Sequence, residues 1–185
     1  MNITPLVMLQ VAFAAWVTWD FVRYLRSGKL RRHVTVFARR RWTEWALGLV
    51  SAWALLACTI VLASLLISSL PSLMGWTWLR LLATPADGPV EGQNLNLAAT
   101  QVPWFGLVFL LLLALNMPRL VRREEEVFRR WTKDWLDALP RSLKFGLMHC
   151  IVGVPIGVGL ALMLPGLAFT SAYFRGGVRA STYLH

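Results

Sequence analysis

Charged residues are scarce in this sequence, and acidic residues are the scarcest. Only 15% of the 185 residues are charged, with nine Asp and Glu against 19 Lys and Arg, whereas 57% are hydrophobic and the mean hydropathy is +0.55. This composition excludes an ordinary soluble domain and is typical of a membrane protein. The length suits about five or six membrane helices and leaves no room for a separate soluble domain.

Cysteine and the common catalytic signatures are also nearly or wholly missing. Cys58 and Cys150 lie inside apolar runs without a paired-thiol spacing, so we interpret them as small packing residues and the sequence implies no disulfide framework. No His-Glu-x-x-His, Gly-x-Ser-x-Gly or phosphate-binding Gly-rich loop is present, so zincin-type, nucleophile-elbow and nucleotide-binding chemistry are disfavoured. The chain also lacks the paired halves with broken helices that are typical of transporters.

The basic residues fall in two blocks beside apolar segments. Residues 23–41 and 118–144 each hold eight Lys and Arg, whereas 71–102 hold only Arg80. We expect a multi-pass integral protein of a bacterial-type inner or equivalent membrane, and the charge asymmetry predicts that the N-terminus lies outside and both blocks are cytoplasmic. The ten Trp fit interfacial belts better than base stacking, so we expect no nucleic-acid partner.

The apolar runs predict an all-α, polytopic helical membrane protein. We expect spans at 3–24, 45–70 and 103–117, the last being short enough to begin in the interface or to continue past Pro118. A new element is expected to begin at Pro140. Residues 1–101 would form an N-terminal pair of spans with a basic loop and an external loop, and 102–185 would form the core.

The last apolar run, 143–174, is too long for a single span. Gly153-Val154-Pro155 is the expected break, giving a short or re-entrant helix and then a span over 156–173. Gly157, Gly159 and Ala161 would let this span pack closely against a neighbour. Residues 175–177, Arg-Gly-Gly, are expected to form a turn.

Three of the nine carboxylates lie together at 124–126, between two apolar segments. Continuous helix would place on one side Val121, Glu124, Phe128, Trp131 and Trp135. Glu124 is then a carboxylate among apolar residues, and carboxyls removed from water can act as bases near neutral pH. Glu126 falls on another side, four residues from Arg122 and Arg130. An amphipathic surface helix with ordinary ion pairs is the alternative.

His149 is the only Asp, Glu, His, Lys or Arg between Lys144 and Arg175. A titratable group inside an apolar segment is costly, which makes it a functional candidate. Two other interpretations stay open. His149 is either packed with a hydrogen bond to a backbone carbonyl, or it is an axial ligand to a haem or chlorophyll.

Three motifs in order resemble the CPBP family of intramembrane glutamic endopeptidases. Residues 124–129 have the form Glu-Glu-x-x-x-Arg, with Phe before the Arg. Residues 145–149 have the form Phe-x-x-x-His, and His185 follows the Arg-Gly-Gly turn by eight residues. This family includes the CAAX prenyl endopeptidases and the bacterial abortive-infection and bacteriocin-immunity proteins. The resemblance covers roughly residues 100–185.

The resemblance implies a role for each motif residue. Glu124 matches the general base that activates water, with Glu125 as the second member of the pair, and Arg129 matches the residue that orients this pair. His149 follows Phe145 and matches the water-positioning His. His185 matches a His that stabilises the oxyanion together with an Asn four residues later, a position beyond the sequence.

The register of the first motif is not unique, because Glu125-Glu126 with Arg130 also satisfies it; we prefer Glu124 because Phe128 then precedes the Arg. The implied reaction is hydrolysis, within the bilayer, of a membrane-associated peptide or protein substrate. One carboxylate and one or two His are a thin ligand set for zinc, so we expect no metal and no other cofactor. The alternative function is that of a catalytically incomplete relative, acting as an accessory or structural subunit of a larger membrane complex.

Overall fold

The fold is all-α, as the sequence predicts. The computed structural model describes residues 5–29, 31, 35, 41–82 and 103–185, and this part of the chain contains helices and no strand. Two expected features lie outside the described residues: parts of the first basic block, at 30, 32–34 and 36–40, and the boundary between the two expected domains, at 101/102.

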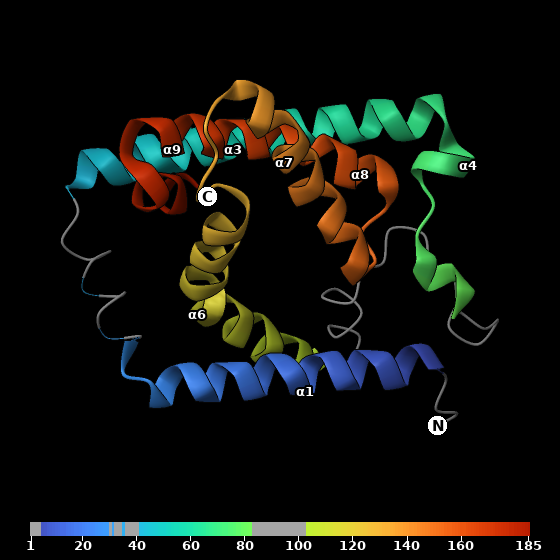
Figure 1. Cartoon of the computed structure of the whole chain (residues 1–185). Coiled ribbons are helices and arrows are strands. Elements are labelled where there is room, and N and C mark those ends of the chain that lie inside the picture. Colours follow the sequence, from blue (N-terminus) through green and yellow to red (C-terminus); the bar gives the residue numbers. More distant parts are fainter. Residues whose placement is uncertain (1–4, 30, 32–34, 36–40, 83–102) are drawn as a thin grey trace.

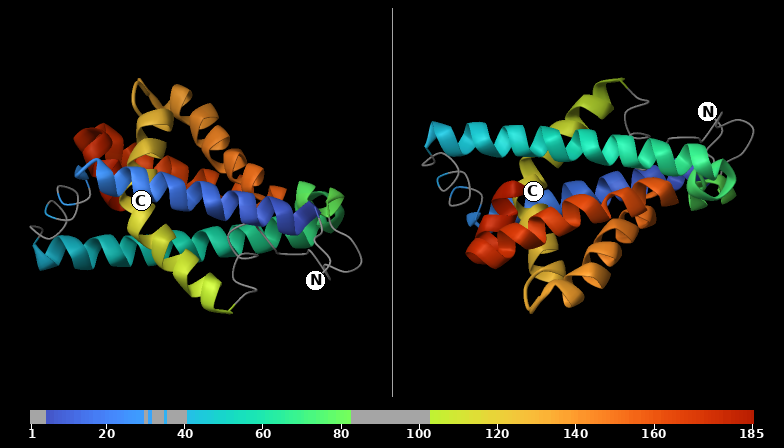
Figure 2. Two further views of the ribbon diagram at one scale, coloured as in Figure 1. Left: turned by 90° about the horizontal axis from the view of Figure 1, so that it is seen from below. Right: turned by 90° about the horizontal axis from the view of Figure 1, so that it is seen from above.

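Three long helices set the framework. α1 (Pro5–Arg26) and α3 (Trp42–Ser69) lie on opposite sides of the molecule, and α6 (Pro103–Phe128) crosses the space between them (Figures 1 and 2). α6 packs against α1 on one side and against α7 and α9 on the other. It continues through Pro118, which agrees with the expected continuation of the 103–117 segment. α6 therefore links the α1 side of the fold to the layer of α3, α7 and α9.

Within the described residues, two helical stretches are long and apolar enough to cross a membrane. They are Trp42–Ser69, with a mean hydropathy of 2.4, and Ile156–Leu184, with 1.6. The first exposes many large apolar side chains, including Leu47, Val50 and Trp53. Apolar residues around a whole helix are expected where lipid covers it. These observations support a membrane location, while the expected spans in α1 and α6 stay predictions.

α7 (Trp135–Met148) begins earlier than expected. The side chain of Asp134 caps it by accepting a hydrogen bond from the Asp137 backbone N–H at 2.8 Å, and Pro140 lies inside the helix. The prediction that an element begins at Pro140 is therefore wrong, because the Asp cap nucleates the helix before the proline. A hydrogen bond from Arg141 lowers the pKa of Asp137, which keeps a negative charge in the first turn of the helix.

The break at Gly153-Val154-Pro155 is confirmed. A 3₁₀ turn, η4 (His149–Val152), follows α7, and Gly153 then takes a left-handed conformation with φ 88° before α8 (Ile156–Ala161) begins. A Cβ at Gly153 would overlap the side chain of Leu79 in η1 (Trp78–Leu81), which follows the short α4 (Pro71–Met74). Glycine is required here both for its conformation and for this close approach.

The small residues of α8 pack closely, also as predicted. Gly157, Gly159 and Ala161 are buried, and a Cβ at Gly157 would lie 3.0 Å from the Ile67 side chain of α3. On the other side of α8, a Cβ at Gly146 of α7 would overlap the carbonyl oxygen of Gly159. α8 therefore packs closely against both α3 and α7.

The expected turn at 175–177 is present as a kink. α9 (Met163–Leu184) loses helical geometry at Gly176 (φ −154°, ψ 22°) and Gly177 (φ 66°, ψ −167°). The final residues continue as helix in a new direction. This change of direction places His185 beside the end of α6.

Candidate functional site

A buried ion pair lies at the C-terminal end of α6. The side chains of Glu125 and Arg129 are 0% and 1% exposed, and Arg129 Nη1 lies 3.3 Å from Glu125 Oε1. Arg129 Nη2 also donates to the carbonyl oxygen of Gly166 in α9, at 3.4 Å. Charged groups are rarely buried unless they are paired, so the fold holds these two side chains as a unit.

The buried carboxylate is Glu125, not Glu124. α6 ends at Phe128, and Trp131 has φ 80°, so the predicted helical face through Trp131 and Trp135 is wrong. Those two Trp are 71% and 52% exposed. The buried face of α6 carries instead Val121, Glu125 and Phe128, at spacings of four and three.

The neighbouring carboxylates are less buried. The side chain of Glu124 is 29% exposed. Glu126 pairs with Arg122 at 3.0 Å on the outer side of the helix, which confirms the expected Arg122–Glu126 ion pair. Arg130 is exposed and lies over the Trp131 ring at 5.0 Å. This geometry favours the register that joins Glu124 and Glu125 to Arg129 over the one that uses Arg130.

Aromatic rings surround the Arg129 guanidinium. Its centre lies 4.1 Å from the Phe145 ring, 5.4 Å from Phe169 and 5.8 Å from Phe128. Ring faces attract a cation that has lost water. Burial lowers the pKa of Arg129, and the opposing charges of Glu125 and Glu124 raise it. Because arginine stays protonated in proteins, the cluster holds a fixed positive charge next to the carboxylates.

His185 joins this cluster from the end of α9. Its Nδ1 lies 2.8 Å from Glu125 Oε1, and its Nε2 lies 3.6 Å from Glu124 Oε2. The ring stacks on Phe169, with centroids 4.3 Å apart and planes at 15°. If Nδ1 carries the proton, it donates a hydrogen bond to Glu125 Oε1, and Nε2 then faces Glu124. The second distance exceeds that of a direct hydrogen bond, so Nε2 faces Glu124 without bonding to it.

His149 is placed differently. Its Nδ1 lies 2.8 Å from the carbonyl oxygen of Phe145, one turn earlier in α7. Among the described residues, no carboxylate pairs with His149. The structure thus places His149 in the backbone-bonded environment that the sequence left open. Both imidazoles contact the Phe145 ring, with centroids at 4.9 Å for His149 and 5.5 Å for His185.

The two histidines line one cavity of about 240 Å³ between α3, α7 and α9. The rest of its wall is mostly apolar, with Leu55 and Leu56 from α3 and Phe145 from α7. Thr59 also lines it, but its hydroxyl donates to the backbone of Leu55. The cavity therefore offers an apolar space with imidazole nitrogens as its titratable groups, and His185 connects it to Glu124 and Glu125.

Two site residues had no recognised signal in the sequence. Phe169 stacks on His185, and Gly166 supplies the carbonyl that accepts from Arg129. A Cβ at Gly166 would lie 3.2 Å from Phe145 Cδ1. Their spacing of three in the glycine-rich span, which puts both on one helix face, is the signal that could have found them.

One carboxylate oxygen in the site has no hydrogen-bond partner. Glu125 Oε2 is buried, and no donor among the described residues reaches it. Buried polar atoms are normally paired, so this oxygen is available to accept a hydrogen bond from a bound water or substrate. For metals, no group of three or more His, Cys, Asp or Glu in the described part of the chain is arranged to hold an ion.

No protein-family model, curated protein or solved structure matches this chain. The resemblance to the CPBP family therefore rests on its motif residues. Glu124, Glu125, Arg129, Phe145 and His185 lie together in the fold, and His149 borders the same cavity as His185.

Proposed function

We propose that this chain is an intramembrane peptidase that hydrolyses a peptide bond of a membrane-associated substrate. The observation that supports this most is the position of His185, which is 2.8 Å from Glu125 Oε1 and 3.6 Å from Glu124 Oε2 and also lines an apolar cavity. In this proposal the protein is a polytopic membrane protein of the CPBP type. Its N-terminus lies outside, and 23–41 and 118–144 are cytoplasmic.

Glu124 is the general base in this mechanism. It is the partly exposed member of the pair, so water can reach it, whereas Glu125 is committed to Arg129 and His185. Glu124 takes a proton from a water held between its carboxylate and His185 Nε2. The hydroxide adds to the peptide carbonyl carbon, and Glu124 then passes the proton to the leaving amine.

The other residues position these groups. Glu125 accepts from His185 Nδ1 and so fixes the ring, as a carboxylate orients the imidazole in many hydrolases. Arg129 holds Glu125 in place. With Nδ1–H directed to Phe145, neutral His149 presents Nε2 to the cavity as an acceptor, and it donates to an oxyanion only when protonated.

The second candidate is an accessory or structural subunit of a larger membrane complex. The buried Glu125–Arg129 pair supports it, because such a pair also specifies packing without any catalysis. In that case Glu124 and His185 would only add further contacts around the structural Glu125–Arg129 pair. Stoichiometric co-purification with another membrane protein, and no cleavage, are its expected signs.

The test compares Glu124→Gln with Glu126→Gln, a matched loss of one carboxylate on the outer side of the same helix. Purified full-length protein in detergent is incubated with peptides solubilised from a bacterial membrane fraction, and new peptide termini are counted by mass spectrometry. We expect new termini with the wild type and Glu126→Gln, and a loss of at least about 100-fold with Glu124→Gln, the low end of general-base effects. New termini that persist with Glu124→Gln, or none with the wild type, would reject the proposal.

A further inference from the structure

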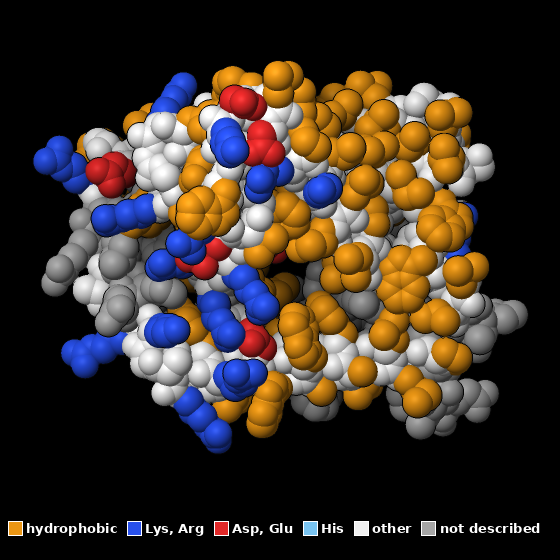
Figure 3. Space-filling model, in the orientation of Figure 1, with side chains coloured by type: hydrophobic (Ala, Val, Ile, Leu, Met, Phe, Trp, Pro, Cys, Tyr) orange, Lys and Arg blue, Asp and Glu red, His pale blue; other side chains and the backbone are white. Residues whose placement is uncertain are grey.

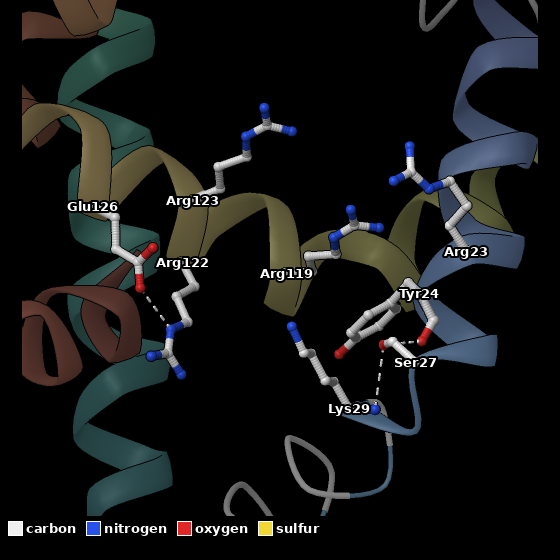
Figure 4. Close-up of a pocket in the computed structure, with 8 residues that line it drawn as sticks. All are labelled: Arg23, Tyr24, Ser27, Lys29, Arg119, Arg122, Arg123 and Glu126. Carbon is white, nitrogen blue, oxygen red and sulfur yellow. Dashed lines mark hydrogen bonds and ion pairs between the residues drawn. The ribbon is translucent and has the colours of Figure 1, made fainter.

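A basic cleft lies between the C-terminal end of α1 and the C-terminal half of α6 (Figure 4). Its volume is about 660 Å³. It draws on both basic blocks, since 23–29 form one wall and 119–126 the other. The lining residues are Arg23, Tyr24, Ser27, Lys29, Arg119, Arg122, Arg123 and Glu126.

The cleft concentrates unpaired positive charge. Its one carboxylate, Glu126, is committed to Arg122 at 3.0 Å, and Arg119 is held by Asp20 at 2.9 Å. Among the described residues, no ion pair involves the side chains of Arg23, Lys29 or Arg123. Figure 4 shows side chains reaching from α1 and from α6 toward the space between the two helices.

The α6 wall carries its cations on one face. Arg119 and Arg123 are four residues apart, and Arg122 follows Arg119 by three residues. Like charges at these spacings repel one another. A bound anion would relieve that repulsion, and guanidinium groups match the geometry of a phosphate, which they bind through two parallel hydrogen bonds.

The surface beside the cleft fits a lipid rather than a soluble ligand. Trp19 and Trp16 precede Arg23 by four and seven residues, so they share its side of α1, and they are 61% and 53% exposed. Exposed Trp next to cations is typical of the level of lipid head groups. Figure 3 shows most Lys and Arg gathered at one end of the molecule and many apolar side chains over the other half of that view.

We propose that this cleft binds the phosphate head group of an anionic phospholipid. The contacts come from Arg23 of α1, from Lys29 just after α1 and from Arg123 of α6. Trp16 and Trp19 lie at the same depth as the upper acyl chain. The phosphate thereby contacts cationic side chains from both walls of the cleft and links α1 to α6. This site is independent of the proposed peptidase chemistry, because none of its residues belongs to the Glu125 cluster.

Native mass spectrometry of the full-length protein in detergent tests this, with phosphatidylglycerol and phosphatidylcholine as probes. The double variant Arg23→Gln/Arg123→Gln removes one cation from each wall. The double variant Lys144→Gln/Arg175→Gln removes two exposed cations elsewhere and is the matched control. We expect the wild type and the control to retain phosphatidylglycerol over phosphatidylcholine. The cleft variant should lose about fivefold in affinity for each cation removed.

An equal loss of phosphatidylglycerol affinity in the control, or no loss of that affinity in the cleft variant, would overturn the proposal. If the cleft variant fails to fold, the wild type alone decides, because equal retention of the two lipids would also overturn it. Inorganic phosphate is the third probe. Adducts of phosphate that depend on Arg23 and Arg123, without retention of phosphatidylglycerol, would assign the cleft to a soluble phosphate compound and reject the lipid.

Discussion

The inner and outer sides of α6 both carry charge, and they differ in how that charge is neutralised. On the inner side, Glu125 and Arg129 are almost fully buried and bond to each other, to His185 and to Gly166. On the outer side, Arg122 pairs with Glu126 at the surface, and Arg123 has no ion pair with a described residue. On the inner side, groups of the protein itself neutralise the charges, whereas the outer side keeps a positive charge that can bind an anion from outside.

This difference shows why the charge pattern of a helix does not by itself locate a site. Both sides contain an Arg four residues from a Glu, at Arg122–Glu126 and at Glu125–Arg129. Only the inner pair is shielded from water, so only there do the interaction partners strongly fix the positions of the charged side chains. The exposed pair is weakened by solvent and salt.

The largest expected effect comes from breaking the inner pair. Arg129→Met leaves Glu125 buried without its cation and should destabilise the protein by about 3–5 kcal/mol. Arg122→Met, on the outer side, should cost less than about 0.5 kcal/mol. Denaturant unfolding in detergent micelles, followed by Trp fluorescence, measures both. Similar losses in the two variants would show that the two sides do not differ as described.

A double-mutant cycle sharpens the same comparison. Adding Glu125→Gln to Arg129→Met should recover part of the loss, because the carboxylate no longer lies buried without a counter-charge. Adding Glu126→Gln to Arg122→Met should change little.

A smaller effect is expected from the packing that closes the inner side. A Cβ at Gly146 would overlap the Gly159 carbonyl oxygen, so Gly146→Ala should push α7 from α8 and cost about 1–3 kcal/mol. Gly48→Ala is the control, since a Cβ there meets nothing within 4 Å. The midpoint of thermal unfolding in detergent compares the two, and an equal shift would contradict the close α7–α8 contact.

Much of the fold could be predicted from the sequence. Apolar length gave the long helices, and Gly153 with Pro155 gave the break before α8. The end of α6 could not be predicted, because 129–134 contain neither Gly nor Pro and Trp131 adopts a positive φ without a sequence signal. The helix was therefore expected to continue through Trp131 and Trp135. On such a helix the apolar face contains Glu124, whereas the observed buried face contains Glu125.

The sequence predicted which residues belong to the candidate site better than it predicted the contacts between them. The motif residues are local in sequence, whereas the bond between His185 and Glu125 spans 60 residues and depends on the kink at Gly176 and Gly177. His149 was a functional candidate because it alone interrupts an apolar run, and the family resemblance matched it to the residue that positions the water. Its bond to Phe145 is local to the helix, and only the fold shows that both imidazoles border one cavity.

The central claim is that His185, rather than His149, bonds to the buried end of α6. The most direct measurement is the ¹⁵N NMR spectrum of histidine-labelled full-length protein in micelles, with the three imidazoles assigned from single His→Gln variants. Glu125→Gln should shift the ring nitrogen resonances of His185, since it replaces the acceptor at Nδ1, and should leave those of His149 in place. A shift at His149 with an unchanged His185 would contradict the account.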